Sequence, residues 1–176
     1  PQRAITVRDL LTHTSGISDV KAPRPNSSLA ELVMGYSREP LAFEPGSKWS
    51  YSNPGINTLG RLVEIASGIP FAEFIQNRLF NPLGMKDTTF WPTKEQQPRV
   101  AKSYKQNKES HQLEETTVYF TEGNLEDRSR TPYPAGGLYS TAKDVACVYL
   151  MMLSGGTFRG QKILRPETVQ LMTTTQ

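Results

Sequence analysis

Cysteine and histidine are scarce in this sequence: Cys147 is the only cysteine and His13 and His111 are the only histidines among 176 residues. One cysteine excludes an internal disulfide and a zinc cluster held by thiolates. Neither histidine has a second one four residues away, as a helical metal site would require. We therefore expect no metal and no other cofactor. Because Cys147 lies in an apolar helical run, we expect it to pack in the interior.

Long apolar runs are also missing, which excludes a transmembrane helix. The content of 36% hydrophobic and 21% charged residues is typical of a soluble globular domain, and 176 residues can bury a sizeable core. The formal net charge of +3 comes from lysines and arginines dispersed along the chain, so no basic stripe for a phosphate backbone emerges. We expect no nucleic-acid partner.

Neither end of the sequence resembles a natural terminus. The chain begins at Pro1 without a charged and then apolar leader, so no signal peptide is visible. Its last four residues, 173–176, do not resemble a natural C-terminus. We expect both ends to be cut, and residues 1–176 to form a single partial domain.

Helix start and stop signals predict a mainly α fold with a few short strands. Thr6–Asp9 and Ser28–Glu31 have the form of capping boxes, Gly68 suits a C-terminal cap, and Asn81-Pro82 is expected to stop the helix that Pro70 opens. The expected helices cover residues 6–11, 28–36, 56–66, 70–79, 141–153 and 166–172.

Two expectations concern the C-terminal half. Residues 92–134 are polar with little periodicity and are predicted to be a long loop region, in which Thr116–Thr121 is the only expected strand. The helix that follows is expected to start at Ser140 or Thr141, with one of them as its N-cap. Its inward-facing residues are predicted to be Val145, Ala146, Tyr149 and Met152.

The segment Tyr51-Ser52-Asn53 is the main candidate for chemistry. After the Pro45-Gly46 turn the chain is expected to be extended, so Tyr51 and Asn53 would point to the same side. A phenol that can exchange a proton and a carboxamide that can bind a polar group suit acyl transfer. Taken singly, Tyr51 as a packed aromatic and Asn53 as a turn residue are the commoner alternatives.

Four segments in a fixed order place this motif in context. They are Ile5–Gly16 (ITVRDLLTHTSG), Tyr51–Asn53 (YSN), Leu79–Met85 (LFNPLGM) and Gly136–Asp144 (GGLYSTAKD). With them the chain resembles the serine β-lactamase and penicillin-binding-protein-like hydrolases, in particular the class C β-lactamase and esterase branch. The resemblance implies an α/β sandwich with a mostly helical lobe and the active site between them. This chain would be the helical lobe of that β-lactamase/transpeptidase-like fold.

The resemblance also implies roles for the motif. In the family a serine in S-x-x-K forms an acyl-enzyme, Tyr51 would match the tyrosine that acts as acid and base, and Asn53 the asparagine that bonds substrate and a lysine. The S-x-x-K segment and the closing Lys/His-[Thr/Gly]-Gly strand are not found in their expected places. We therefore expect part of a serine hydrolase for a β-lactam, a D-amino-acid peptide or amide, or an ester, and expect these residues alone to be inactive.

Two accidental S-x-x-K strings occur, and we reject both as nucleophiles. Ser18 enters a proline-containing loop, where Lys21 would not lie one helical turn away. Ser140 precedes Lys143 at a helix start, where an N-cap is the better explanation and the order of motifs disagrees.

An alternative function is a non-catalytic helical binding or interaction domain that keeps the family architecture. We also expect an uncovered apolar face that favours self-association. His13 is interpreted as a cap at a helix end, and Lys48 as a solvated lysine rather than a group that tunes Tyr51. The location is open, although the resemblance favours the periplasm or cell envelope.

Overall fold

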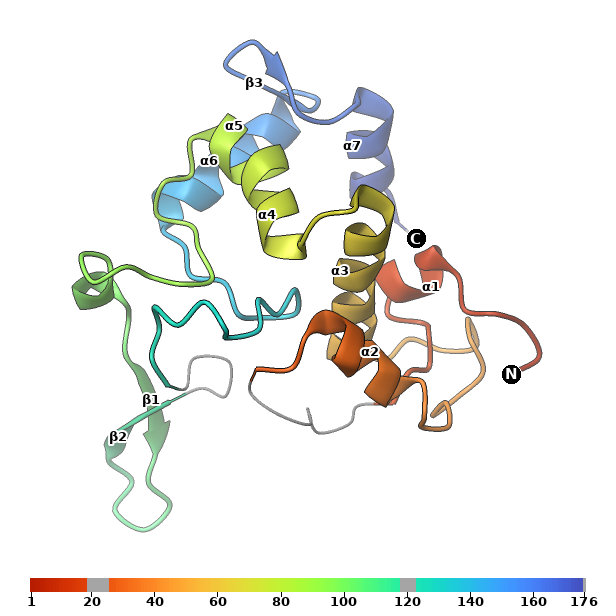
Figure 1. Cartoon of the computed structure of the whole chain (residues 1–176), viewed down its shortest axis with the longest axis horizontal. Helices are drawn as coiled ribbons and strands as arrows, with labels where there is room; N and C mark the ends of the chain where they lie inside the picture. Colours follow the sequence, from red (N-terminus) through yellow and green to blue (C-terminus); the bar gives the residue numbers. More distant parts are fainter. Residues whose placement is uncertain (19–25, 118–122, 176) are drawn as a thin grey trace.

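The computed structural model describes residues 1–18, 26–117 and 123–175. These residues form a mostly helical body, from which one β-hairpin projects (Figure 1). The elements are α1 (Val7–Leu11), α2 (Leu29–Tyr36), α3 (Asn53–Ser67), α4 (Phe71–Ile75), a π-helix (Gln76–Phe80), α5 (Asn81–Leu83), a 3-10 turn (Gln97–Arg99), β1 (Ser103–Gln106), β2 (Leu113–Thr116), α6 (Ala142–Leu153), β3 (Thr157–Phe158), β4 (Gln161–Lys162) and α7 (Pro166–Thr173). The mainly α prediction is confirmed for these residues.

Both predicted capping boxes are present. The Thr6 hydroxyl accepts from the Asp9 backbone N–H, and the Asp9 carboxylate accepts from the Thr6 N–H. Ser28 and Glu31 repeat the arrangement at the start of α2. Each capping box thereby satisfies two N–H groups of its helix start with partners that the local sequence supplies.

The longest helix, α3, ends as predicted at Gly68, whose φ of 75° lies in the left-handed region. Helix α3 packs against α1, α2 and α4 and so joins the N-terminal helices to the rest of the body (Figure 1). The close approach of α3 to Pro134 requires a glycine at position 60, because a Cβ there would lie 2.2 Å from the Pro134 side chain.

The expected helix stop at Asn81-Pro82 is wrong. The chain continues from α4 through one π-turn into α5, and Pro82 lies in the first turn of α5. The proline has no N–H to donate, and the wider π-turn before it, in which the Asn81 N–H bonds to the Gln76 carbonyl five residues back, accommodates it. The actual end is at Gly84, which is left-handed with a φ of 68°.

Most buried apolar side chains of the described residues belong to two clusters. One surrounds α5 and α6 and contains Phe80, Leu83, Met85, Met151 and Phe158. The other lies between α2 and residue 133, and contains Leu29, Leu32, Tyr36 and Tyr133. Cys147 packs against the first cluster and is partly buried, in line with the expected packing role.

The predicted inward face of α6 is largely wrong. Met152 packs against the first cluster as expected, but Val145, Ala146 and Tyr149 are exposed, Tyr149 by 66%. The helix instead buries Asp144 and Met151. Because α6 is apolar on nearly every side, periodicity could not decide which side would meet the core.

The polar region 92–134 contains a hairpin that was not predicted. Strands β1 and β2 pair antiparallel, with Ser103 opposite Thr116. Their side chains are mostly exposed, so no alternation of apolar residues marks them. Of the expected strand at Thr116–Thr121, Thr116 ends β2 and residues 118–122 lie outside the described residues. No described helix is long and apolar enough to span a bilayer.

The Asp9 carboxylate stabilises the N-terminal region through charged and neutral hydrogen bonds. It accepts from both terminal nitrogens of Arg3, at 2.7 and 2.9 Å, and from the Thr6 hydroxyl at 2.7 Å. The Arg3 guanidinium, followed by the Thr6 backbone and hydroxyl, holds the pKa of Asp9 well below its ordinary value. A depressed folded-state pKa stabilises the fold above the unfolded pKa of about 4, and this contribution is lost as the pH falls.

We therefore expect Asp9→Asn to lower the free energy of unfolding by about 2 kcal/mol at pH 7. The difference from the unsubstituted protein should shrink as the pH is lowered below about 4, because Asp9 of the unfolded chain then binds a proton that the folded carboxylate does not, which favours unfolding. Urea denaturation at several pH values measures this difference. Glu39→Gln, at an exposed carboxylate, is the control. A difference that stayed constant down to pH 2 would contradict the assignment.

Candidate active site

The motif Tyr51-Ser52-Asn53 straddles the start of α3. Ser52 is extended, with φ −140° and ψ 104°, and its hydroxyl accepts from the Gly55 N–H at 3.0 Å as the N-cap. Asn53 is the first residue of the helix. The expectation of one extended segment is therefore correct only up to Ser52, because the helix begins inside the motif.

The Tyr51 side chain is 62% exposed and is not a packed core aromatic. Its ring centroid lies 4.8 Å from that of His13, with an angle of 32° between the ring planes. The Trp49 ring lies 6.1 Å from the His13 ring, at an angle of 75° between the ring planes. The phenol thus stands at the surface on a small aromatic cluster that includes His13 and Trp49.

The Asn53 side chain combines burial with an unmet hydrogen-bonding capacity. Its Oδ1 is buried, and within the described part of the chain it receives no hydrogen bond. A buried acceptor without a donor costs about 1–3 kcal/mol and is rare in native structures. Such an oxygen is suited to receive a donor from a ligand or from another polypeptide segment.

His13 does not cap α1, which corrects that expectation. The last carbonyls of the helix are bonded by backbone groups, Thr12 N–H to Arg8 O and Thr14 N–H to Asp9 O. The imidazole Nδ1 instead accepts from the Ser52 N–H at 3.1 Å. A helix-end interpretation missed this because the partner lies 39 residues further along the chain.

Asn57 is a site-supporting residue that the motif did not reveal. It is only 3% exposed; its Nδ2 donates to the Tyr36 hydroxyl at 3.1 Å, and its Oδ1 accepts from the Ala135 N–H at 3.2 Å. These bonds connect α3 to α2 and to the turn before Gly136. The spacing of four residues from Asn53 places both amides on one side of α3, and this could have identified it.

Lys48 lies over the Phe43 ring at 4.9 Å and is exposed, in keeping with a surface role. The Ser18 hydroxyl donates a hydrogen bond to the Pro40 carbonyl at 2.7 Å, and this bond joins two loop segments. Its sequence partner Lys21 lies outside the described residues.

Ser140 is held in a hydrogen-bond chain rather than acting as N-cap. The N-cap of α6 is Thr141, whose hydroxyl accepts from the Asp144 N–H at 3.2 Å. The Thr88 hydroxyl donates to Asp144 Oδ2 at 2.8 Å and lies 2.8 Å from Ser140 Oγ. Since the single Thr88 proton goes to the carboxylate, Ser140 donates to Thr88.

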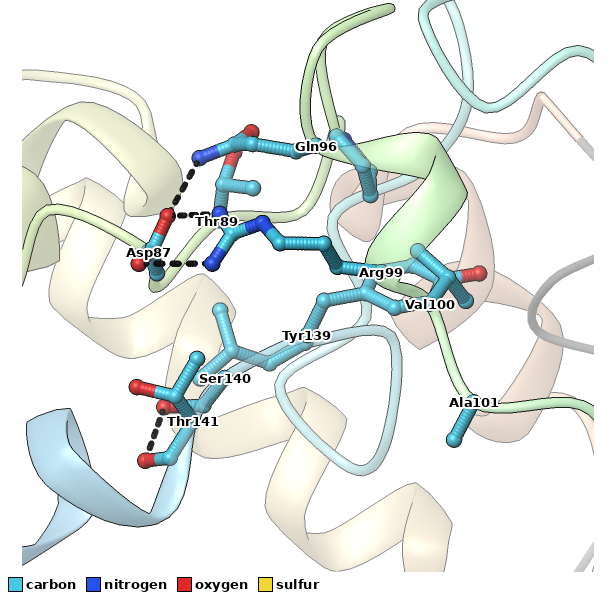
Figure 2. A pocket seen from close by; sticks show the side chains of 11 residues that line it. Asp87, Thr89, Gln96, Arg99, Val100, Ala101, Tyr139, Ser140 and Thr141 are labelled. Atoms are coloured by element: carbon cyan, nitrogen blue, oxygen red, sulfur yellow. Dashed lines mark hydrogen bonds and ion pairs between the residues drawn. The ribbon is translucent and has the colours of Figure 1, made fainter.

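Ser140 also borders a pocket of about 300 Å³ (Figure 2). On the opposite wall Arg99 forms an ion pair with Asp87, to which Gln96 also donates (Figure 2). The remaining lining includes Val100, Ala101 and Tyr139. Neither residue of the predicted catalytic pair is among the residues that line this pocket.

The described residues contain no cluster of three His, Cys, Asp or Glu side chains arranged to hold a metal ion.

The family assignment rests on the whole length of the sequence. A family model described as beta-lactamase matches residues 1–176. The chain belongs to the β-lactamase family. The sequence resemblance to β-lactamase-like and penicillin-binding-protein-like hydrolases is thereby confirmed.

Three proteins to which the chain is similar have widely different names. The chain is 30% identical to a lovastatin esterase of Penicillium rubens, over 98% of this chain and 44% of the esterase. A solved variant of the simvastatin synthase of Aspergillus terreus is 29% identical, with a TM-score of 0.72 over 97% of this chain and 40% of the synthase. The D-amino acid amidase of Ochrobactrum anthropi is 25% identical, with a TM-score of 0.67 over 94% of this chain and 47% of the amidase. The chain thus spans less than half the length of each of these proteins.

Proposed function

We propose that this chain is the helical lobe of a serine hydrolase that forms an acyl-enzyme, with residues 1–176 as one partial domain. The observation that carries the proposal is the pairing of an exposed phenol at Tyr51 with the buried, unpartnered Oδ1 of Asn53 at the start of α3. Family membership supports the chemistry, because the names of its members include esterase and amidase.

Tyr51 would exchange the proton of the nucleophile and of the leaving group. A neutral phenol is a poor base, and a favourable interaction with nearby positive charge stabilises the ionised form that can accept a proton. Lysines contributed by the remainder of the enzyme would supply this interaction. The exposure of Tyr51 leaves its ring free to face such groups.

Asn53 would bind the substrate and one of those lysines. An ammonium group or a substrate amide has the donor that the Asn53 oxygen needs. The catalytic serine would come from a segment outside these residues, because Ser18 and Ser140 both have structural partners, Pro40 and Thr88.

The proposed substrates share a carbonyl that can acylate a serine. They are an ester, a D-amino-acid amide or peptide, and a β-lactam, and the named esterase, the named amidase and the family description each support one of them.

The full-length gene product tests this function directly. We expect it to hydrolyse a chromogenic ester or a chromogenic cephalosporin, or to be labelled covalently by a fluorescent penicillin. Residues 1–176 alone should do none of these. Ser140→Ala in the full-length protein should leave the reaction unchanged. A full-length protein that reacts with none of the probes would favour the alternative of a non-catalytic binding domain, and labelling of Ser140 would refute the placement of the nucleophile elsewhere.

We further propose that residues 1–176 self-associate through an uncovered apolar face of α6. Val145, Tyr149 and Leu153 follow at intervals of four residues and are all exposed, Leu153 by 84%. Such a stripe on an isolated helix face favours association. We expect sedimentation velocity to show oligomers of residues 1–176 and Leu153→Glu to shift them to monomers. Leu113→Glu, at another highly exposed position, on β2, should not change the association. A monomer at all concentrations would contradict this proposal.

A further inference from the structure

His13 adopts an unusual backbone conformation next to the Tyr51 segment. Its φ is 58°, in the left-handed region that residues other than glycine seldom adopt. Such a conformation costs on the order of 1 kcal/mol and persists where surrounding contacts hold it. For His13 these contacts come from the residues on either side of Tyr51.

One residue bonds to both neighbours of Tyr51. The Ser50 N–H donates to the His13 carbonyl at 2.9 Å, and the Ser52 N–H donates to the His13 Nδ1 at 3.1 Å. Tyr51 lies between these two donors, so its backbone is restrained on each side by the same histidine. The left-handed φ of His13 accompanies this double contact.

The third contact is between the rings. The His13 imidazole lies 4.8 Å from the Tyr51 ring, tilted by 32°. Because Tyr51 is 62% exposed, burial in a core does not fix its ring. The histidine therefore supplies both the backbone restraint and a surface for the phenol ring.

The bond to Ser52 also sets the tautomer of His13. A nitrogen that accepts from a backbone N–H carries no proton, so the neutral imidazole has its proton on Nε2. The ring therefore acts here as an acceptor through Nδ1.

We propose that His13 is a positioning residue, which holds Tyr51 in place for proton transfer through the acceptor at Nδ1. The inference rests on the proposed role of Tyr51 in the hydrolase. Proton transfer is sensitive to placement, since a displacement of about 1 Å can cost on the order of 10²-fold in rate. We call the two backbone contacts of His13, to Ser50 and to Ser52, the clamp. Loss of the clamp should lower kcat more strongly than it weakens substrate binding.

Two substitutions separate the acceptor from the ring. His13→Asn keeps an acceptor at the same distance from Cβ and tolerates a left-handed φ, but it removes the ring. His13→Phe keeps a ring and removes the acceptor. In the full-length protein, we expect His13→Phe to lower kcat about 10- to 100-fold with KM changed less than about threefold. His13→Asn should retain kcat within about threefold of the unsubstituted protein.

His111 provides a matched control. It is exposed near the β1–β2 hairpin and has a φ of 56°, so His111→Phe and His111→Asn carry the same backbone strain away from Tyr51. Both should leave kcat unchanged. Thermal unfolding of all four variants measures the strain separately from the rate.

The positioning role would be overturned by a His13→Phe enzyme with unchanged kcat, or by His13→Asn losing as much as His13→Phe. Nitrogen NMR of the His13 ring in the full-length protein tests the clamp by a measurement that does not depend on enzymatic activity. We expect an unprotonated, hydrogen-bonded Nδ1, and a proton on Nδ1 would contradict the geometry. A full-length protein that hydrolyses no probe but shows the expected tautomer would refute the proposed function and leave the clamp intact.

Discussion

Tyr51→Phe in the full-length protein is expected to lower kcat/KM about 10²- to 10⁴-fold, the usual contribution of a positioned acid or base. The substitution removes only the hydroxyl, and the ring can still lie against His13 at the 4.8 Å spacing of the two centroids. Because the Tyr51 side chain is mostly exposed, removal of its hydroxyl should change the free energy of unfolding by less than about 0.5 kcal/mol.

Steady-state hydrolysis of the best ester, amide or lactam substrate measures this effect. Tyr104→Phe is the matched control, because Tyr104 is 54% exposed on β1, far along the chain from the motif. It should behave as the unsubstituted protein does. A Tyr51→Phe enzyme with a kcat/KM within about threefold of normal would remove Tyr51 from the proton-transfer role.

Asn53→Ala is expected to lower kcat/KM about 10²- to 10³-fold, because it removes a preorganised polar group that would meet substrate and lysine. In contrast to most buried polar substitutions, it should not destabilise residues 1–176. The Asn53 oxygen is buried without a donor among the described residues, so its removal relieves a cost of about 1–3 kcal/mol.

Asn57→Ala makes the comparison decisive. Asn57 lies one helical turn further along α3 and uses both ends of its amide, toward Tyr36 and Ala135. Its loss should reduce the free energy of unfolding by about 2 kcal/mol, because the Tyr36 hydroxyl and the partly buried Ala135 N–H each lose the hydrogen bond that Asn57 provides. Urea denaturation of both variants tests the contrast. Equal destabilisation by the two substitutions would mean that Asn53 is a structural residue.

Local signals in the sequence predicted the starts of α1 and α2. Thr6 with Asp9 and Ser28 with Glu31 are partners three residues apart, so each capping box is complete within one turn. Gly68 likewise ends α3 because glycine adopts a left-handed φ at low cost. In these cases both partners lie in the same turn, and the sequence was sufficient; the Ser52–Gly55 cap of α3 is equally local but was missed, because Tyr51-Ser52-Asn53 was expected to be extended.

Predictions failed where the deciding partner was remote. The buried side of α6 depends on the cluster around Phe80 and Phe158, which the apolar pattern of α6 itself does not encode. The role of Ser140 depends on Thr88, 52 residues away. The role of His13 depends on Ser52, 39 residues away.

The amino-acid sequence by itself determined the family, the helical character and the identity of Tyr51 and Asn53 as the candidate pair. Ordered motifs and short-range hydrogen bonds involve residues that are close together in the sequence, so they can be recognised without coordinates. Only the tertiary structure decided that Tyr51 is exposed against His13 and that the Asn53 oxygen is buried without a donor. Burial and long-range pairing arise when distant segments pack together, and no local pattern specifies which segments will meet.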